Sequence, residues 1–229
     1  METRFDRVSY RYGSVQALTD VSFTVPSGQT VALLGANGAG KSTTVDLLLG
    51  LKRPGSGTVT VLGGPPHDAV TRGRVGAMLQ TGGLPADSTV REIVGLACGL
   101  YGGRRTVADV LDLAGLREVG RRKVDALSGG QAQRVRFAVA MAGKPELLFL
   151  DEPTVALDFK ARRQFWRSVR AEGATVVFAT HYLDEADEYA DRVIVLDNGR
   201  VIADGPPAQV KGDRSLEHAL VALTEEAAE

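Results

Sequence analysis

The feature that most constrains this chain is a glycine-rich loop between a strand-like run and a helix-like run. Residues 35–42 read GANGAGKS and fit the pattern G-x-x-x-x-G-K-[ST]. The run 30–34 is apolar and typical of a strand, and residues 41–51 favour a helix. Glycines in such a loop let successive backbone N–H groups face phosphate oxygens, at a helix N-terminus whose dipole favours negative charge. The sequence therefore predicts a phosphate-binding loop and nucleotide binding.

The residues of this loop have distinct expected roles. Lys41 is expected to neutralise the β- and γ-phosphates, and the Ser42 hydroxyl is expected to ligate Mg²⁺. The loop therefore predicts a nucleotide and Mg²⁺ as cofactors. The other residues expected to contact the nucleotide are Gly35, Ala36, Asn37, Gly38, Ala39, Gly40 and Thr43.

A second apolar run, residues 147–150, ends on the two acids Asp151 and Glu152. A buried strand here would deliver Asp151 to the Mg²⁺ side of the site. Glu152 would reach the water that attacks the γ-phosphate and act as its general base. Strands often end on acids before a turn, so this pattern alone is weak. Downstream of a phosphate-binding loop it indicates a nucleotide hydrolase.

Further runs indicate the fold class. Residues 175–179 and 193–196 are also short and apolar, and helical patterns separate the strand-like runs, which predicts a parallel sheet covered on both faces. Ligands bind beyond the carboxyl ends of the strands in such sheets. Residues 1–28 and 57–62 suggest an antiparallel flank. Residues 85–143 are predicted to be mainly helical, with an interruption at Gly102-Gly103. Asp197-Asn198-Gly199 predicts a hairpin.

Composition excludes several classes. The chain has 229 residues, is 44% hydrophobic and carries a formal net charge of −1, so it can bury a core and shows no charge bias toward nucleic acid or an anionic membrane. The single cysteine, Cys98, cannot form an internal disulfide. The N-terminus lacks an apolar signal region, and no apolar run reaches 18 residues. We expect a cytoplasmic protein that reaches a membrane only by docking to another protein.

The segment 127–131 reads LSGGQ. Ser128 followed by Gln131 fits a helix-capping box, and a glycine-rich helix start with a serine hydroxyl also makes a second anion site. One nucleotide needs only one phosphate-binding loop, so this second site is expected to close on the nucleotide of a second copy. These residues resemble the signature motif of ABC-type ATPases.

The resemblance covers nearly the whole chain in the order and spacing of that family. It implies that the nucleotide of the second copy contacts Ser128, Gly129, Gly130, Gln131 and the D-loop residue Asp158. It implies that Tyr12 stacks on adenine, although an exposed hairpin aromatic is the alternative interpretation. By resemblance, Gln80 senses Mg²⁺ and the attacking water, and His181 contacts the γ-phosphate. The implied catalytic residues are Glu152, His181 and Gln80, and the implied Mg²⁺ ligands are Ser42, Gln80 and Asp151.

The implied fold is α/β, a P-loop NTPase (RecA-like) core with a mainly parallel sheet, an antiparallel β flank and a helical lobe. A single domain over residues 1–229 is expected, with core and flank at 1–80 and 144–229 and the lobe at 81–143. One departure lies at the D-loop, where the family commonly has Gly-Leu-Asp-Pro and this chain has Ala156-Leu157-Asp158-Phe159. Replacing the proline is expected to alter the turn into the next helix.

The segments 80–92 and 180–186 resemble ABC exporters of the ABC-2 type. The expected function is the energy-coupling subunit of a membrane exporter, acting as a head-to-tail homodimer with two ATP at the interface. A membrane permease is expected to dock near the Q-loop and helical lobe, which places the chain peripherally on the cytoplasmic face of the membrane. The alternative is a soluble ABC ATPase acting on nucleic acid, ribosomes or cofactor assembly. The basic run Lys160 to Arg170 is interpreted as a solvated helix, so no nucleic-acid partner is expected.

Overall fold

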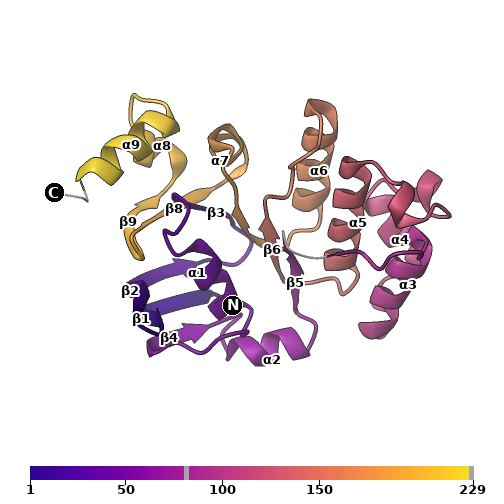
Figure 1. Ribbon diagram of the computed structural model, residues 1–229, viewed down its shortest axis with the longest axis horizontal. Helices are drawn as coiled ribbons and strands as arrows, with labels where there is room; N and C mark the ends of the chain where they lie inside the picture. Colours follow the sequence, from indigo (N-terminus) through magenta and orange to yellow (C-terminus); the bar gives the residue numbers. More distant parts are fainter. Residues whose placement is uncertain (80–82, 227–229) are drawn as a thin grey trace. The chain divides into compact units, whose positions relative to one another are not determined.

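The computed structural model describes residues 1–79 and 83–226 (Figure 1). The chain divides into two units. The first unit comprises Met1–Thr71 and Thr175–Glu229, and the second comprises Arg72–Ala174. The first unit is therefore formed by the N-terminal and C-terminal segments of the chain, and the second unit by the segment between them.

The first unit contains two sheets and flanking helices. Its elements are β1 (Thr3–Tyr12), β2 (Val15–Val25), β3 (Thr30–Leu34), α1 (Lys41–Leu48), β4 (Ser56–Thr60), α2 (Pro66–Thr71), β7 (Thr175–Ala179), α7 (Leu183–Tyr189), β8 (Arg192–Asp197), β9 (Arg200–Gly205), α8 (Pro207–Lys211) and α9 (Leu216–Glu226).

The larger sheet of this unit has the strand order β7-β3-β8-β9. The central strand β3 pairs in parallel with both β7 and β8, and β9 joins β8 in an antiparallel hairpin. All residues of β3 and β7 are buried, as expected for parallel strands covered on both faces. The hairpin turns at Asn198 and Gly199, whose φ angles of 44° and 71° both lie in the left-handed region. The predicted hairpin and parallel arrangement are confirmed.

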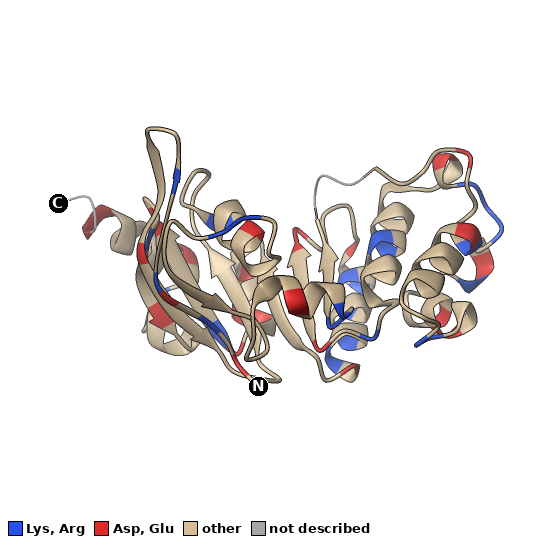
Figure 2. Cartoon of the chain, turned by 90° about the horizontal axis from the view of Figure 1, so that it is seen from below, with Lys and Arg blue, Asp and Glu red and all other residues tan. Residues whose placement is uncertain are grey.

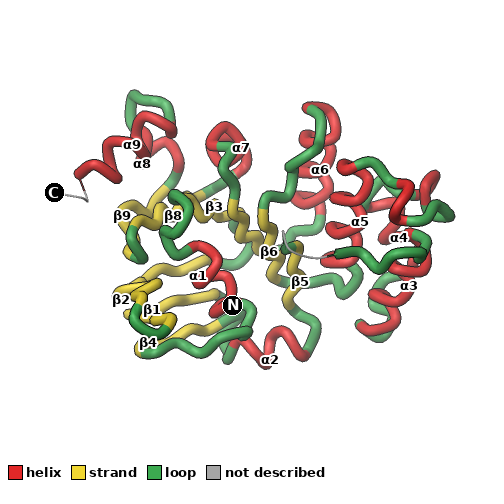
Figure 3. The backbone as a smooth tube through the Cα atoms, in the orientation of Figure 1, coloured by secondary structure: helices red, strands yellow, loops and turns green. Residues whose placement is uncertain are grey.

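The smaller sheet is antiparallel, in the order β2-β1-β4 (Figure 3). Phe5 and Phe23 face each other across β1 and β2 with ring centroids 4.5 Å apart. Val59 on β4 is also buried, as its alternation with polar neighbours predicts. The antiparallel flank is thereby confirmed, and helix α1 packs against its strands β2 and β4.

Helix α1 is shorter than the sequence suggests, because it ends at Leu48 and not at residue 51. Gly50 follows with a φ angle of 69°, the left-handed conformation that commonly terminates helices. A Cβ atom at this position would lie 2.9 Å from the backbone nitrogen of His67. The chain therefore turns here and leads back toward the antiparallel sheet.

The second unit is mostly helical around a pair of parallel strands. Its elements are β5 (Val75–Met78), α3 (Val90–Leu100), α4 (Val107–Leu113), the 3₁₀ turns η1 (Arg117–Val119) and η2 (Val124–Ala126), α5 (Gly129–Met141), β6 (Leu147–Asp151) and α6 (Phe159–Ala171). Both strands lack Lys and Arg, and the basic residues of this unit lie on its helices and loops (Figure 2).

Aromatic packing supports the helices of the second unit. Phe165 and Trp166 on α6 are buried, and the Phe165 ring meets Phe137 of α5 edge-on with centroids 4.7 Å apart. Burial of each such side chain contributes about 1.5–3 kcal/mol. Four of the five basic residues of α6 are exposed: Lys160, Arg163, Arg167 and Arg170. Arg162 lies on the same face as Phe165, Trp166 and Val169 and is half-buried, so the predicted solvated amphipathic helix is confirmed except at this residue.

The predicted α/β fold class is confirmed, with a mainly parallel sheet, an antiparallel sheet and a largely helical region. Within residues 1–79 and 83–226, none of the helices has the length and apolar character that a membrane crossing requires.

Candidate functional site

The glycine-rich loop follows β3 directly and leads into α1, as the sequence predicts. The Lys41 ammonium folds back across the loop and donates to the carbonyl oxygens of Gly35, at 2.6 Å, and Ala36, at 3.0 Å. No side chain in the described part of the chain caps the N-terminus of α1, where Gly40 is the N-cap residue. Uncapped N–H groups, the helix dipole and the lysine together form a site for a phosphate group.

Two glycines of the loop are required by the packing around them. Gly35 has a φ angle of 146°, and a Cβ atom there would lie 2.2 Å from the carbonyl oxygen of Leu196. Gly40 has a φ angle of 107°, and its added Cβ would lie 2.6 Å from a methyl group of Leu18. Strands β8 and β2 therefore hold the loop in place from outside. A larger residue at either position is both strained and sterically blocked.

Tyr12 lies at the end of β1, beside the first turn of α1. Its hydroxyl is 3.5 Å from the Thr43 hydroxyl, and its ring packs edge-on against Tyr10. It keeps 45% of its surface exposed. Tyr12 is a hairpin aromatic, and the fold also places it beside the phosphate loop, the position that base stacking would require.

His181 follows the buried strand β7 and is exposed in the loop before α7. Its ring lies 4.0 Å from that of Tyr182, centroid to centroid. The preceding Thr180 is buried, and its hydroxyl accepts a hydrogen bond from the Tyr182 backbone nitrogen at 3.1 Å. The buried threonine anchors the loop, so His181 lies just beyond the carboxyl end of β7, the neighbour of the central strand β3.

Asp151 and Glu152 are half-buried at the carboxyl end of β6, in the second unit. Glu152 has a φ angle of 47°, which a non-glycine residue adopts only when its surroundings enforce it. The enforcing contact comes from α5. The buried Gln133 side chain donates to the carbonyl oxygens of Glu152, at 2.9 Å, and Pro153, at 3.1 Å. Sequence reasoning missed Gln133, because no linear signal connects it to Glu152.

The signature segment begins helix α5. Ser128 accepts a hydrogen bond from the Gln131 backbone nitrogen at 3.2 Å, while the Gln131 side chain accepts from the Ser128 nitrogen at 3.0 Å. The predicted capping box is thereby confirmed, and Ser128 is exposed. A Cβ atom added to Gly130 would lie 3.0 Å from the Ala156 carbonyl oxygen. The glycines of the signature segment therefore let the D-loop pack against the start of α5.

The departure at the D-loop does not abolish the turn into α6. Asp158 is the N-cap residue, and its carboxylate accepts a hydrogen bond from the Ala161 nitrogen at 2.8 Å. Phe159 occupies the first helical position, where proline is otherwise favoured. Its ring is 71% exposed, and the Arg163 guanidinium lies 5.7 Å from the ring centroid. The aspartate cap thus starts the helix without the proline.

Gln80 lies outside the described residues, so its expected role stays a prediction. The other predicted site residues divide between the units. Tyr12, the glycine-rich loop and His181 belong to the first unit, and the acids, the signature segment and the D-loop belong to the second.

A glycine-rich phosphate loop on a parallel α/β fold defines a P-loop nucleotide-binding protein. Comparison with known families narrows the class. The model of the ABC transporter family matches residues 18–155. The chain therefore belongs to the ABC transporter family, and it is an ATP-binding ATPase of that family.

Individual relatives agree with this assignment. The Nod factor export ATP-binding protein I of Burkholderia orbicola is 40% identical over 213 residues, covering 89% of this chain and 70% of the relative. The protein of the same name from Sinorhizobium fredii is 42% identical, covering 87% of this chain and 61% of the relative.

Solved structures show the same fold. An ATP-binding subunit of an ABC transporter has a TM-score of 0.87 and 29% identity, covering 98% of this chain and 100% of that chain. A dimeric ATP-binding cassette in a post-hydrolysis state, bound to ADP and Pi, has a TM-score of 0.78 and 27% identity, covering 89% of this chain and 98% of that chain.

Proposed function

We propose that this chain is the ATP-hydrolysing subunit of a membrane exporter, working as a head-to-tail homodimer docked to a separate permease. The observation that carries the proposal is its likeness, at 40% identity over 89% of the chain, to proteins named for export. The cargo is then a property of the permease. Docking occurs near the Q-loop and the helical lobe (residues 81–143), on the cytoplasmic face of the membrane. Residues 1–80 and 144–229 form the core and flank of the single domain.

Binding of the nucleotide rests first on the phosphate loop. Lys41 leaves the carbonyls of Gly35 and Ala36 and pairs with the β- and γ-phosphates, while the N–H groups at the start of α1 donate to phosphate oxygens. The Tyr12 ring stacks on adenine. These residues all belong to the first unit, so the base and the phosphate loop's share of the triphosphate are bound by one and the same copy.

The donor set fits Mg²⁺ rather than a softer metal. Within the described ranges, no cluster of three or more His, Cys, Asp or Glu is placed to hold a metal. Mg²⁺ prefers oxygen ligands, and in nucleotide sites it is characteristically bound by one or two carboxylates together with phosphates and water. The Ser42 hydroxyl, the Asp151 carboxylate and the Gln80 side chain supply such oxygens. The ion, when bound, neutralises charge on the β- and γ-phosphates.

The second copy completes the site. Ser128 presents an exposed hydroxyl at a helix N-terminus, and the D-loop packs on the same helix start, so both form one surface of the second unit. That surface meets the γ-phosphate held by the other copy. Glu152 accepts a proton from the attacking water, and His181 donates a hydrogen bond to the γ-phosphate. Hydrolysis opens the dimer, because only ATP contacts both copies.

The test is the mass of Glu152→Gln measured by light scattering with ATP, with ADP and without nucleotide. ATP is expected to produce a dimer, and ADP is not. A chain that stays monomeric at high concentration and saturating ATP contradicts the homodimer. Tagged Glu152→Gln, trapped with ATP in native membranes, is expected to co-purify a polytopic membrane protein. Recovery of ribosomal proteins or nucleic acid without such a partner would instead favour a non-transport ATPase.

A further inference from the structure

Lys52 lies over the ring of Tyr12, although the two residues are distant in sequence. The Lys52 ammonium nitrogen is 5.2 Å from the centroid of the tyrosine ring. This is within the range of a cation–π interaction, in which the cation is attracted to the negative face of the ring. Lys52 follows the end of α1 by four residues and is half-buried.

Asp46 holds the lysine in this place. Its carboxylate lies on α1, and its Oδ2 atom is 3.0 Å from the Lys52 nitrogen. The side chains of the pair are 28% and 29% exposed, so both are partly shielded from water. The hydrogen bond with Asp46 raises the pKa of Lys52 above its usual value, and proximity to Tyr12 adds to this. Both contacts therefore favour the charged form of Lys52.

Tyr12 itself is held by contacts on several sides. Besides Lys52, its ring meets the Tyr10 ring at 5.0 Å, and its hydroxyl lies 3.5 Å from that of Thr43. With these contacts in place, Tyr12 still has 45% of its surface exposed. Of these contacts, Lys52 is the one that lies over the ring, whereas the Tyr10 ring meets it at an interplanar angle of 75° and Thr43 lies at the phenol hydroxyl.

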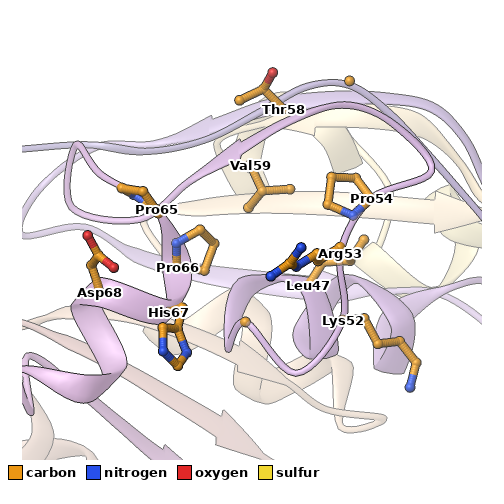
Figure 4. A pocket seen from close by; sticks show the side chains of 12 residues that line it. Leu47, Lys52, Arg53, Pro54, Thr58, Val59, Pro65, Pro66, His67 and Asp68 are labelled. Atoms are coloured by element: carbon orange, nitrogen blue, oxygen red, sulfur yellow. The ribbon is translucent and has the colours of Figure 1, made fainter.

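Lys52 lies next to a pocket, but its ammonium group does not point toward the far side of that pocket. Lys52 also borders a pocket of about 520 Å³ between the end of α1, β4 and the start of α2. In Figure 4 its side chain extends away from Pro66 and His67, and the Arg53 side chain is the one nearer to them. The ammonium group thus serves Tyr12 and Asp46 and not this pocket.

We propose that Lys52 is a positioning residue for the nucleobase, holding the Tyr12 ring in the orientation that stacks on the base of ATP. The proposal rests on the proposed role of Tyr12 in the nucleotide site. It assigns Lys52 no contact with the phosphates. Its effect must therefore depend on the presence of a base in the ligand and of an aromatic ring at position 12.

The experiment compares ATP with inorganic tripolyphosphate, which carries the phosphates without a base. Equilibrium Kd values are measured by calorimetry for wild type, Lys52→Met and Lys52→Arg. Lys52→Met is expected to raise the Kd for ATP about two- to fivefold, the range of an exposed cation–π contact, and to leave that for tripolyphosphate unchanged. Lys52→Arg keeps the cation and is expected to restore ATP binding. In steady-state assays the loss is expected in KM and not in kcat.

Lys211→Met is the matched control. Lys211 is also 28% exposed and paired with an aspartate, Asp187, on the α7–α8 side of the first unit. The Lys211→Met substitution removes a comparable ion pair at a position distant from Tyr12 in sequence. This variant is expected to bind ATP as the wild type does. A similar loss in Lys211→Met would show that the effect of Lys52→Met is a general consequence of losing an ion pair, which overturns the proposal.

Tyr12→Ala separates the possible failures. If it leaves the ATP Kd unchanged, the proposed stacking role of Tyr12 is wrong and the role of Lys52 falls with it. If Tyr12→Ala weakens ATP binding but Lys52→Met does not, only the Lys52 proposal is wrong. Equal weakening of ATP and tripolyphosphate by Lys52→Met also overturns it, since that result places the lysine on the phosphates. In the Tyr12→Ala background, Lys52→Met is expected to add nothing.

Discussion

Glu152 illustrates how this chain holds one residue in a costly conformation. Its left-handed backbone carries strain of order 1–3 kcal/mol, and the buried amide of Gln133 offsets that strain through its two hydrogen bonds. Arg136 donates in turn to the Gln133 amide oxygen at 3.1 Å, which fixes the orientation of the amide. The proposed general base is thus held by α5, the helix that begins with the signature segment.

Gln133→Ala is predicted to lower kcat about tenfold with little change in the Kd for ATP. The substitution leaves the carbonyls of Glu152 and Pro153 without the amide donor, a loss of about 1–3 kcal/mol, and frees the base from its position. Gln164→Ala on the exposed side of α6 is the control and is expected to retain full kcat. Equal kcat values for both variants would show that Gln133 has no part in positioning Glu152.

Residues that are contiguous in the motif could be predicted from sequence, whereas residues that meet only in the fold could not. The glycine-rich loop and the capping box depend on neighbours a few positions apart, so their local geometry follows from the pattern. Lys52 and Gln133 act through residues of other segments, 40 and 19 positions away. No periodicity or spacing marks such pairs.

At the scale of elements, three helices of the second unit begin with the same motif, a capping box. Thr89 on α3, Thr106 on α4 and Ser128 on α5 each form a complete capping box. Only the cap of α5 is also expected to meet a nucleotide. Thr106 therefore offers a matched control for separating the stabilising role of a cap from a role in the cycle.

Ser128→Ala and Thr106→Ala are each predicted to cost about 1 kcal/mol of unfolding free energy, because each helix loses its cap. Urea unfolding measures this loss. In the Glu152→Gln background, Ser128→Ala is also predicted to weaken the ATP-dependent dimer, while Thr106→Ala leaves the dimer intact. If ATP produces the dimer equally well in both variants, Ser128 caps its helix but has no role in the dimer.

The ion pair of Arg74 and Glu146 links the starts of the parallel strands β5 and β6. Arg74 Nε donates to Glu146 Oε1 at 2.7 Å, and this hydrogen bond holds the pKa of Glu146 below its usual 4.5. A lowered pKa in the folded state means that the stabilisation is present above pH 4.5. It is lost as the pH falls through the folded-state pKa.

Arg74→Met is accordingly predicted to reduce the unfolding free energy near pH 7 by no more than about 1 kcal/mol, since Glu146 is 56% exposed. The difference from wild type is predicted to shrink as the pH falls below 4.5. Urea midpoints measured from pH 7 to pH 3 follow this change. A difference that is constant over that range would mean that the charge of Glu146 makes no contribution.

Strand β5 marks where prediction of elements failed. It has only four residues and includes Gly76, so it offers too little alternation or β-branching to be recognised. The packing nevertheless requires this glycine, because a Cβ there would lie 2.2 Å from the Ala140 carbonyl oxygen of α5. The longer apolar runs 30–34 and 175–179 predict strands whose bounds agree with those of β3 and β7.

At the scale of the whole molecule, the residues proposed to bind and hydrolyse ATP are divided between the two units of one chain. The first unit carries the phosphate loop and His181, and the second carries the signature segment and Glu152. If two copies pair head to tail, each of the two sites takes its phosphate loop from one copy and its signature segment from the other. A defect in either half then disables both sites of a homodimer.

This arrangement predicts complementation between two inactive variants. Lys41→Met removes the phosphate-loop cation, and Ser128→Arg places a bulky cation at the signature segment, so each variant alone is expected to be inactive. In a mixed dimer, the Ser128→Arg copy contributes an intact phosphate loop and the Lys41→Met copy an intact signature segment, which together form one complete site. With random pairing at equal amounts, half of the dimers are mixed and have one of two sites intact, so ATPase activity should reach about a quarter of wild type. A mixture with no more ATPase activity than either variant alone would contradict the head-to-tail dimer, because that dimer must bring the intact phosphate loop of one variant to the intact signature segment of the other.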